Sequence, residues 1–245
     1  MKKFTAFTLS EVLVTVGIIG VISALTVPAL VRNYQEEAQA VQLRKVFSEI
    51  ESAIDMLITE EGKTSLASTS IARDNGVDNF IKTHLKTIKT CDSSNTNECF
   101  ANENYLPISG NGSKTFTCSG NSYILANSAA ICASKTFLVD IDGSLNGEKL
   151  ENASRQVKGV NIELYIDING SKEPNIGGRD MFHVFIQPDG RIYDQALYED
   201  FICGGNPPVC LFPGTGTHNL PNCVSDAFGS GCFARLLDNN WKMNY

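Results

Sequence analysis

The chain has 245 residues, of which 42% are hydrophobic and 19% are charged. This ordinary globular composition excludes an intrinsically disordered chain and a collagen-like repeat. Its 20 Lys and Arg against 27 Asp and Glu give a net charge of −7, which argues against nucleic acid bound by a basic patch.

The first element in the chain is an apolar segment. Residues 7–31 carry a single charge, Glu11, and residues 12–31 carry none. A helix of about 20 apolar residues is long enough to span a bilayer. Because Lys2 and Lys3 precede this segment, the positive-inside rule predicts a cytoplasmic N-terminus and an exported remainder. The sequence therefore predicts a single-pass membrane protein.

Three explanations compete for this segment: a cleaved secretory signal, a plain membrane anchor, or a segment that uses Glu11. A secretory signal has an apolar region of about 7 to 15 residues, which is shorter than the run found here. A plain anchor explains the length, but it does not explain an acidic side chain near the start of the apolar run, where an unpaired charge is costly. Glu11 therefore needs a cation nearby.

The residues around Glu11 resemble a known signal. The basic leader Lys-Lys-Phe-Thr-Ala at residues 2–6, followed by Phe-Thr-Leu-Ser-Glu and the apolar run, resembles the prepilin leader of type IV pilins and type II secretion pseudopilins. The resemblance implies that a prepilin peptidase cleaves between Ala6 and Phe7 and that Phe7 is then N-methylated. Ala6 stands where the family usually has Gly. Glu11 becomes the fifth mature residue, which the resemblance implies pairs with the N-terminal ammonium of a neighbouring subunit.

The same resemblance implies a function and a set of partners. The chain would be a structural pilin or pseudopilin of a type IV pilus-like or type II secretion filament, extracellular or periplasmic once assembled. Its partners would be prepilin peptidase, other pilin or pseudopilin subunits, an inner-membrane assembly platform and the lipid bilayer. Two alternatives stay open: a minor pilin that acts as an adhesin or ligand-binding tip subunit, and a membrane-anchored exported enzyme.

Beyond residue 31 the pattern changes to that of an amphipathic helix. Apolar residues recur at spacings of three to five, with charged residues between them: Tyr34, Ala38, Val41, Val46, Ile50, Ile54 and Leu57. No Gly or Pro interrupts residues 32–61, and Gly62 stands where a C-terminal cap is expected. The pattern predicts one helix over residues 7–61, with a kink or local unwinding at residues 24–28 because of Pro28.

The sequence divides into four parts: a leader at residues 1–6, an apolar half-helix at 7–31, an amphipathic half-helix at 32–62 and a head domain at 63–245. Residues 62–75 are polar and predict a linker. In the head, we expect helices at 78–89 and 233–239 and a loop at 91–104. We expect strands at 114–118, 123–126, 136–141 and 160–168. A hairpin is expected at 182–194, with its turn at Pro188-Asp189-Gly190. The fold class is α+β and pilin-like: a long N-terminal helix packed on an antiparallel sheet, with a loop-rich C-terminal region.

Eight cysteines all lie in the exported part, which indicates an oxidising compartment and disulfide bonds. Short spacings predict four pairs: Cys91 with Cys99, Cys118 with Cys132, Cys203 with Cys210, and Cys223 with Cys232. Zinc is a weaker hypothesis, because no Cys-x-x-Cys pair occurs.

One loop carries hard oxygen ligands. Asp167, Asn169, Glu173 and Asp180 lie close together in the sequence, and this donor set suits calcium. The competing interpretation is a turn, because Asp and Asn favour turns through side-chain hydrogen bonds to the backbone. Both interpretations stay open, and calcium is the one cofactor that the sequence suggests.

Catalytic motifs are absent from the sequence, and the three histidines, His84, His183 and His218, lie in unlike contexts. We therefore expect a non-catalytic protein. Late aromatic residues predict either a binding face or anchors for a loop-rich region, and we favour the anchors: Phe201, Phe212, Phe228, Phe233, Trp241 and Tyr245.

Overall fold

The structure of this protein is a computed structural model. It describes residues 8–137, 144–145, 148–149, 160–194 and 223–245. The chain divides into two compact units, Met1–Ala38 and Gln39–Tyr245.

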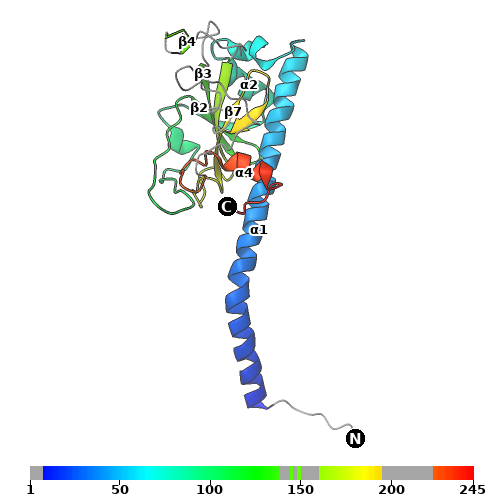
Figure 1. Cartoon of the computed structure of the whole chain (residues 1–245), viewed down its shortest axis with the longest axis vertical. Helices are drawn as coiled ribbons and strands as arrows, with labels where there is room; N and C mark the ends of the chain where they lie inside the picture. The colour runs from blue at the N-terminus through cyan, green and yellow to red at the C-terminus, as the bar shows by residue number, and fades with distance from the viewer. Residues whose placement is uncertain (1–7, 138–143, 146–147, 150–159, 195–222) are drawn as a thin grey trace. The chain divides into compact units, whose positions relative to one another are not determined.

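Helix α1 runs from Leu9 to Glu60, 52 residues, close to the predicted span. It contains Pro28 and stays helical throughout, as the unbroken ribbon in Figure 1 shows. Of the kink or local unwinding expected at residues 24–28, the unwinding is therefore not found. Proline removes one amide donor, the one that would bond the carbonyl of residue 24, and the bonds on either side persist. One missing bond does not interrupt a helix of this length.

The end of α1 is capped by Gly62, as predicted. Gly62 is left-handed, with φ 61°. Its N–H donates to the Thr59 carbonyl (3.1 Å), and the Lys63 N–H donates to the Ile58 carbonyl (2.9 Å). This pair of bonds is a Schellman motif, which satisfies carbonyls that a helix end leaves open.

The head contains a six-stranded antiparallel sheet in the order β1-β2-β3-β6-β7-β8. Its strands are β1 (Thr87–Cys91), β2 (Asn121–Leu125), β3 (Ala130–Phe137), β6 (Val160–Asp167), β7 (Met181–Ile186) and β8 (Ile192–Asp194). A separate two-stranded ladder joins β4 (Ser144–Leu145) and β5 (Glu148–Lys149). The predicted strand at 160–168 and the predicted hairpin at 182–194 are both confirmed.

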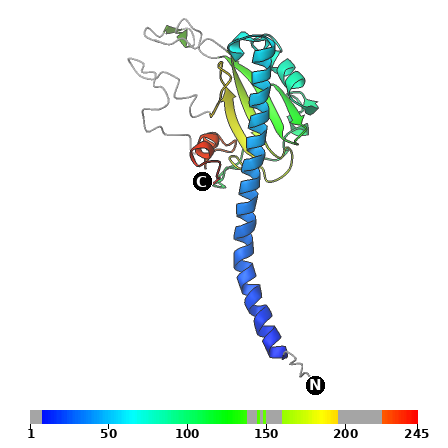
Figure 2. The same cartoon turned by 90° about the vertical axis from the view of Figure 1, so that its right-hand side faces the viewer.

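Residues 39–60 of α1 lie across one face of this sheet (Figure 2). Alternate residues of β6, Ile162, Leu164 and Ile166, are buried on that face, as period two requires. The helix contributes Val46, Ile50, Ile54 and Leu57 to this core, as its spacing predicts, together with Leu43, Phe47 and Ala53. The first three residues of the predicted stripe are not buried: Tyr34 and Val41 are 75% and 64% exposed, and Ala38 is exposed as well.

A second core covers the opposite face of the sheet. It gathers aromatic side chains around two disulfides and includes Phe100, Tyr105, Phe116, Met181 and the four cysteines 91, 99, 118 and 132. The sheet is thus buried on both faces, by the helix on one side and by disulfide-linked loops on the other.

Two local predictions were wrong, and a predicted helix has different bounds. Residues 62–75 are not a linker: they form the 3-10 helices η1 (Leu66–Ser68) and η2 (Ser70–Ala72), whose Leu66 and Ile71 are buried. The helix expected at 78–89 is α2 (Gly76–His84), and the chain then enters β1. Residues 114–118 form no strand, and only an isolated bridge joins Tyr105 to Lys114. In each case packing against distant residues outweighs the local pattern.

The C-terminal region closes on α1. Helix α4 (Cys232–Asp238) matches the predicted 233–239 within a residue. Its Phe233 stacks on Phe47 of α1, with ring centroids 4.2 Å apart, and Trp241 lies 6.4 Å from Phe47. These late aromatics are anchors, as favoured above; Phe201 and Phe212 lie outside the described residues.

Candidate functional site

The first candidate site is the apolar surface of α1 in the N-terminal unit. The helix is long and apolar enough to cross a membrane, and its most apolar stretch is not buried within the described chain. Large apolar side chains point outward all round it, among them Leu9, Leu13, Val16, Ile19, Leu25 and Leu30. A helix that is hydrophobic on every face needs a lipid or protein environment.

Glu11 is held at the start of this helix by Thr8. The Thr8 N–H and hydroxyl donate to Glu11 Oε2 at 2.8 and 2.9 Å, and the Glu11 N–H donates to Thr8 Oγ1 (3.3 Å). This is a capping box, in which Thr8 and Glu11 satisfy each other's open donors. The spacing Thr-x-x-Glu before an apolar run is the sequence signal for a capping box, so this contact was predictable from residues 8–11.

The capping box supplies hydrogen-bond donors to only one of the two carboxylate oxygens of Glu11. One carboxylate oxygen, Oε2, is already satisfied within the chain, whereas Oε1 accepts no hydrogen bond from a residue that the structure describes. A cation from another molecule can therefore still approach Oε1. The predicted cleavage residues Ala6 and Phe7 lie outside the described ranges.

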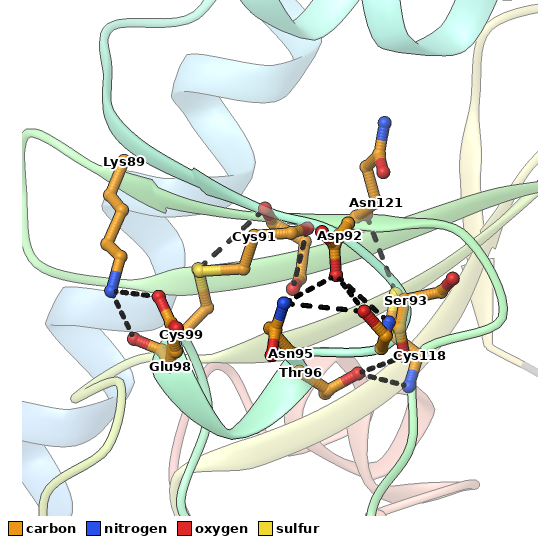
Figure 3. Close-up of a disulfide and its surroundings, with 12 residues drawn as sticks. Lys89, Cys91, Asp92, Ser93, Asn95, Thr96, Glu98, Cys99, Cys118 and Asn121 are labelled. Atoms are coloured by element: carbon orange, nitrogen blue, oxygen red, sulfur yellow. Dashed lines mark hydrogen bonds and ion pairs between the residues drawn. A yellow bond between two sulfur atoms is a disulfide. The ribbon is translucent and has the colours of Figure 1, made fainter.

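Three of the four predicted disulfides are present: Cys91–Cys99, Cys118–Cys132 and Cys223–Cys232. Figure 3 shows the first, whose short loop is ordered by Asp92: Asp92 Oδ1 accepts from the Ser94 N–H (3.1 Å) and from Asn95 Nδ2 (3.0 Å). Lys89 Nζ pairs with Glu98 Oε2 at 2.9 Å beside it. The predicted pair Cys203 and Cys210 lies outside the described residues.

The structure brings Asp167, Asn169 and Asp180 together, whereas Glu173 is exposed. All four oxygens of the two Asp carboxylates accept hydrogen bonds from the protein. For Asp167 the donors are the Asn169 N–H (3.1 Å) and the Tyr105 hydroxyl (2.5 Å). For Asp180 they are the Ile176 N–H (2.6 Å) and Asn169 Nδ2 (3.3 Å).

This arrangement does not fit calcium. Among the described residues two buried amide oxygens, Asn169 Oδ1 and Asn175 Oδ1, lack a donor. Protein donors already engage all four carboxylate oxygens of Asp167 and Asp180, and Glu173 is exposed. Within the described residues no group of three or more His, Cys, Asp or Glu side chains could hold a metal ion. The turn interpretation suits this loop better.

The buried carboxylates hold a proton instead. Burial, opposed by backbone hydrogen bonds, raises the pKa of Asp180 to about 7. Burial and the nearby Asp180 charge raise the pKa of Asp167 well above its ordinary value. Two carboxylates at close range in a desolvated site do not both ionise at neutral pH.

We expect this pair to make stability fall as the pH rises. The folded-state pKa of Asp180 is about 7 against an ordinary 3.8, so the folded state binds more protons than the unfolded state between those values. The urea midpoint of the wild type should therefore drop between about pH 5 and about pH 8 by more than that of Asp180→Asn, which has no carboxyl to ionise at position 180. Equal drops in the two proteins would contradict this assignment.

Two of the three histidines, His84 and His183, lie in the described chain. His183 Nε2 lies 2.9 Å from Glu163 Oε1, and Nδ1 lies 3.2 Å from Ser230 Oγ, which resembles a Ser-His-Glu triad in connectivity. However, Ser230 and His183 are both buried, and the imidazole stacks on Tyr165 at 4.0 Å. His84 lies 3.9 Å from Glu60, and His218 lies outside the described residues.

The head also has an open, solvent-facing polar cavity of about 520 Å³ on its surface, between the start of α2 and the β2–β3 hairpin. Two carboxylates line it. Burial opposes ionisation of Asp78, but hydrogen bonds from Lys82, Tyr123 and Asn121 outweigh it and lower its pKa. The hydrogen bond with His183 lowers the pKa of Glu163 against the effect of burial. Both groups are therefore ionised at neutral pH, and neither is suited to donate a catalytic proton.

Comparison of the chain with protein-family models, with curated proteins and with solved structures found no match.

Proposed function

We propose that this protein is a non-catalytic subunit of a type IV pilus-like or type II secretion filament. The observation that carries the proposal is the prepilin-type sequence at residues 2–11, continued by an apolar helix that has no cover within the described chain. The antiparallel head built on residues 39–60 of the same helix is compatible with a pilin-like layout.

The apolar helix suits two successive environments. In the membrane, lipid covers residues 9–31, and the N-terminus is cytoplasmic while the head is exported. In a filament, the same side chains pack against those of neighbouring copies, so extraction from lipid leaves no apolar surface in water. A helix that is apolar on all faces serves both states without refolding.

In this proposal Glu11 favours the transfer of the helix from lipid to a filament that offers a cation. Its Oε2 is held by Thr8, while Oε1 is open toward a cation. Cleavage between Ala6 and Phe7 would create an ammonium at Phe7, which in a neighbouring subunit supplies that cation. A carboxylate in an apolar core is stable only when it is paired in this way.

A second candidate is a minor subunit whose head binds a ligand. The observation that favours it is the polar cavity of about 520 Å³, which a purely structural head does not require.

The test is recovery of the chain in filaments. The full chain would be expressed in a host that carries prepilin peptidase and an assembly platform, and sheared filaments would be collected by centrifugation. We expect the cleaved chain in the sheared fraction, and none there when the peptidase is inactivated. A chain that is cleaved but stays wholly in the membrane fraction would oppose the proposal.

A further inference from the structure

The polar cavity lies where the sheet is incomplete. Pairing of β2 with β3 begins at Asn121 and Ala133, whereas pairing of β3 with β6 continues to Phe137 and Val160. Past Ala133, β3 therefore has no described strand on its β2 side. Gly120 approaches the β3 backbone closely at this point, because a Cβ there would stand 2.5 Å from the Ala133 carbonyl oxygen.

Polar groups from several segments converge on this space. The segment between η2 and α2 supplies Arg73 and Asn75, and α2 supplies Asp78. Ser93 comes from the loop between β1 and the 3-10 helix η3 (Thr96–Glu98). The other polar lining residues come from the turn before β2, from β2 and β3, and from β6: Ser119, Asn121, Tyr123, Ser134, Lys135 and Glu163. The apolar groups among the described lining residues are Val77, Ala133 and the ring of Tyr123. Such a lining cannot desolvate an apolar ligand favourably, but it can exchange hydrogen bonds with a strongly polar one.

Most charged groups in the lining are already engaged. Asp78 accepts from Lys82 Nζ (2.7 Å) and from Asn121 Nδ2 (2.8 Å). Glu163 accepts from the Tyr165 hydroxyl (3.0 Å) and the Ser134 hydroxyl (3.2 Å). Lys135 Nζ donates to the Ala72 carbonyl (2.6 Å).

Arg73 differs from these groups. It is exposed, and no residue of the described chain hydrogen-bonds its guanidinium. Glu61 attracts it through space, but the Glu61 carboxylate already accepts from the Ser70 N–H (2.8 Å). The hydroxyls of Ser93 and Ser119 and the amide of Asn75 also have no hydrogen bond to another described side chain. One planar cationic fork and several neutral hydrogen-bonding groups therefore face the same space.

We propose that this cavity binds a small polyhydroxylated carboxylate of the sugar-acid class. Arg73 would hold the carboxylate through its paired N–H groups, the geometry that guanidinium and carboxylate share. Ser93, Ser119 and Asn75 would exchange hydrogen bonds with the ligand hydroxyls. The ionised Asp78 and Glu163 in the lining disfavour a doubly charged anion such as a phosphate ester, so the ligand carries a single negative charge.

The proposal is independent of filament assembly, because it concerns the head alone and can be tested on unassembled protein. The full chain, purified in detergent with its disulfides intact, would be titrated with D-glucuronate and with D-glucose, its uncharged counterpart, by calorimetry and ligand-observed NMR. We expect saturable binding of glucuronate and at least about tenfold weaker binding of glucose, since a charge-assisted pair is lost.

Matched variants locate the site. Arg73→Gln should weaken glucuronate binding about tenfold or more, whereas Arg191→Gln, which changes an exposed arginine in the β7–β8 hairpin, should leave it unchanged. Ser119→Trp places a large ring at an exposed position of the lining and should block both sugars. Absence of glucuronate binding, equal binding of the two sugars, or binding that survives Arg73→Gln would each overturn the proposal.

Discussion

Replacement of Glu11 by Ala should abolish incorporation of the chain into filaments while leaving its membrane insertion and its head intact. The variant loses the carboxylate that would pair with the ammonium of a neighbouring subunit. An unpaired charge in an apolar core costs at least a few kcal/mol, which is enough to reduce incorporation by a hundredfold or more, as roughly 1.4 kcal/mol corresponds to a factor of ten. The measurement is the amount of chain in sheared filaments relative to membranes.

A matched variant separates the ion pair from the capping box. Gln at position 11 keeps an oxygen that can accept from the Thr8 N–H and hydroxyl, but it has no charge. Glu11→Gln should therefore fail to assemble as Glu11→Ala does. Normal assembly of Glu11→Gln would mean that Glu11 acts only as a helix cap, and the intersubunit ion pair would have to be abandoned.

Replacement of Phe47 by Ala should destabilise the head by about 3–5 kcal/mol, the usual cost of removing a buried Phe. Phe47 is 3% exposed and joins α1 to the C-terminal region through its stacking on Phe233. Total stabilities are about 5–15 kcal/mol, so this loss is a large fraction of the whole. Trp241 is the single tryptophan and lies beside Phe47, so its fluorescence reports the unfolding transition directly.

Val41→Ala is the control for this experiment, because Val41 is on the same helix and is 64% exposed. It should change the free energy of unfolding by less than about 0.5 kcal/mol. If the two variants unfolded at the same urea concentration, the contact between α1 and the C-terminal region would not contribute to stability as described.

Local sequence signals correctly predicted the elements that are determined by neighbouring residues, such as turns and helix ends. The hairpin at 182–194 follows from Pro188-Asp189-Gly190 between two apolar runs, and the end of α1 follows from Gly62. The pattern of α1 also predicted its core positions near Ile50 and Ile54, because a helix repeats its buried face every 3.6 residues.

Features that depend on contacts between residues far apart in the sequence could not be predicted from local patterns. Ile71 lies in a polar stretch and is buried because α2 and the sheet cover it, and Phe116 is buried by a core rather than by a strand ladder. The Asp167 carboxylate meets Tyr105, which lies 62 residues away in the sequence, so its protonation could not be inferred from the loop alone. The polar cavity likewise joins segments as far apart as Arg73 and Glu163.

The most direct test of the central claim is the intact mass and N-terminal sequence of the membrane-extracted chain, coexpressed with prepilin peptidase and left unreduced. We expect a chain that begins at N-methylated Phe7, without the six residues of the leader and, with all eight cysteines paired, lighter by eight hydrogens. An uncut chain beginning at Met1 would make this an anchored membrane protein, and a chain beginning after Ala24 would make it a secreted one. Either result would contradict the filament subunit proposed here.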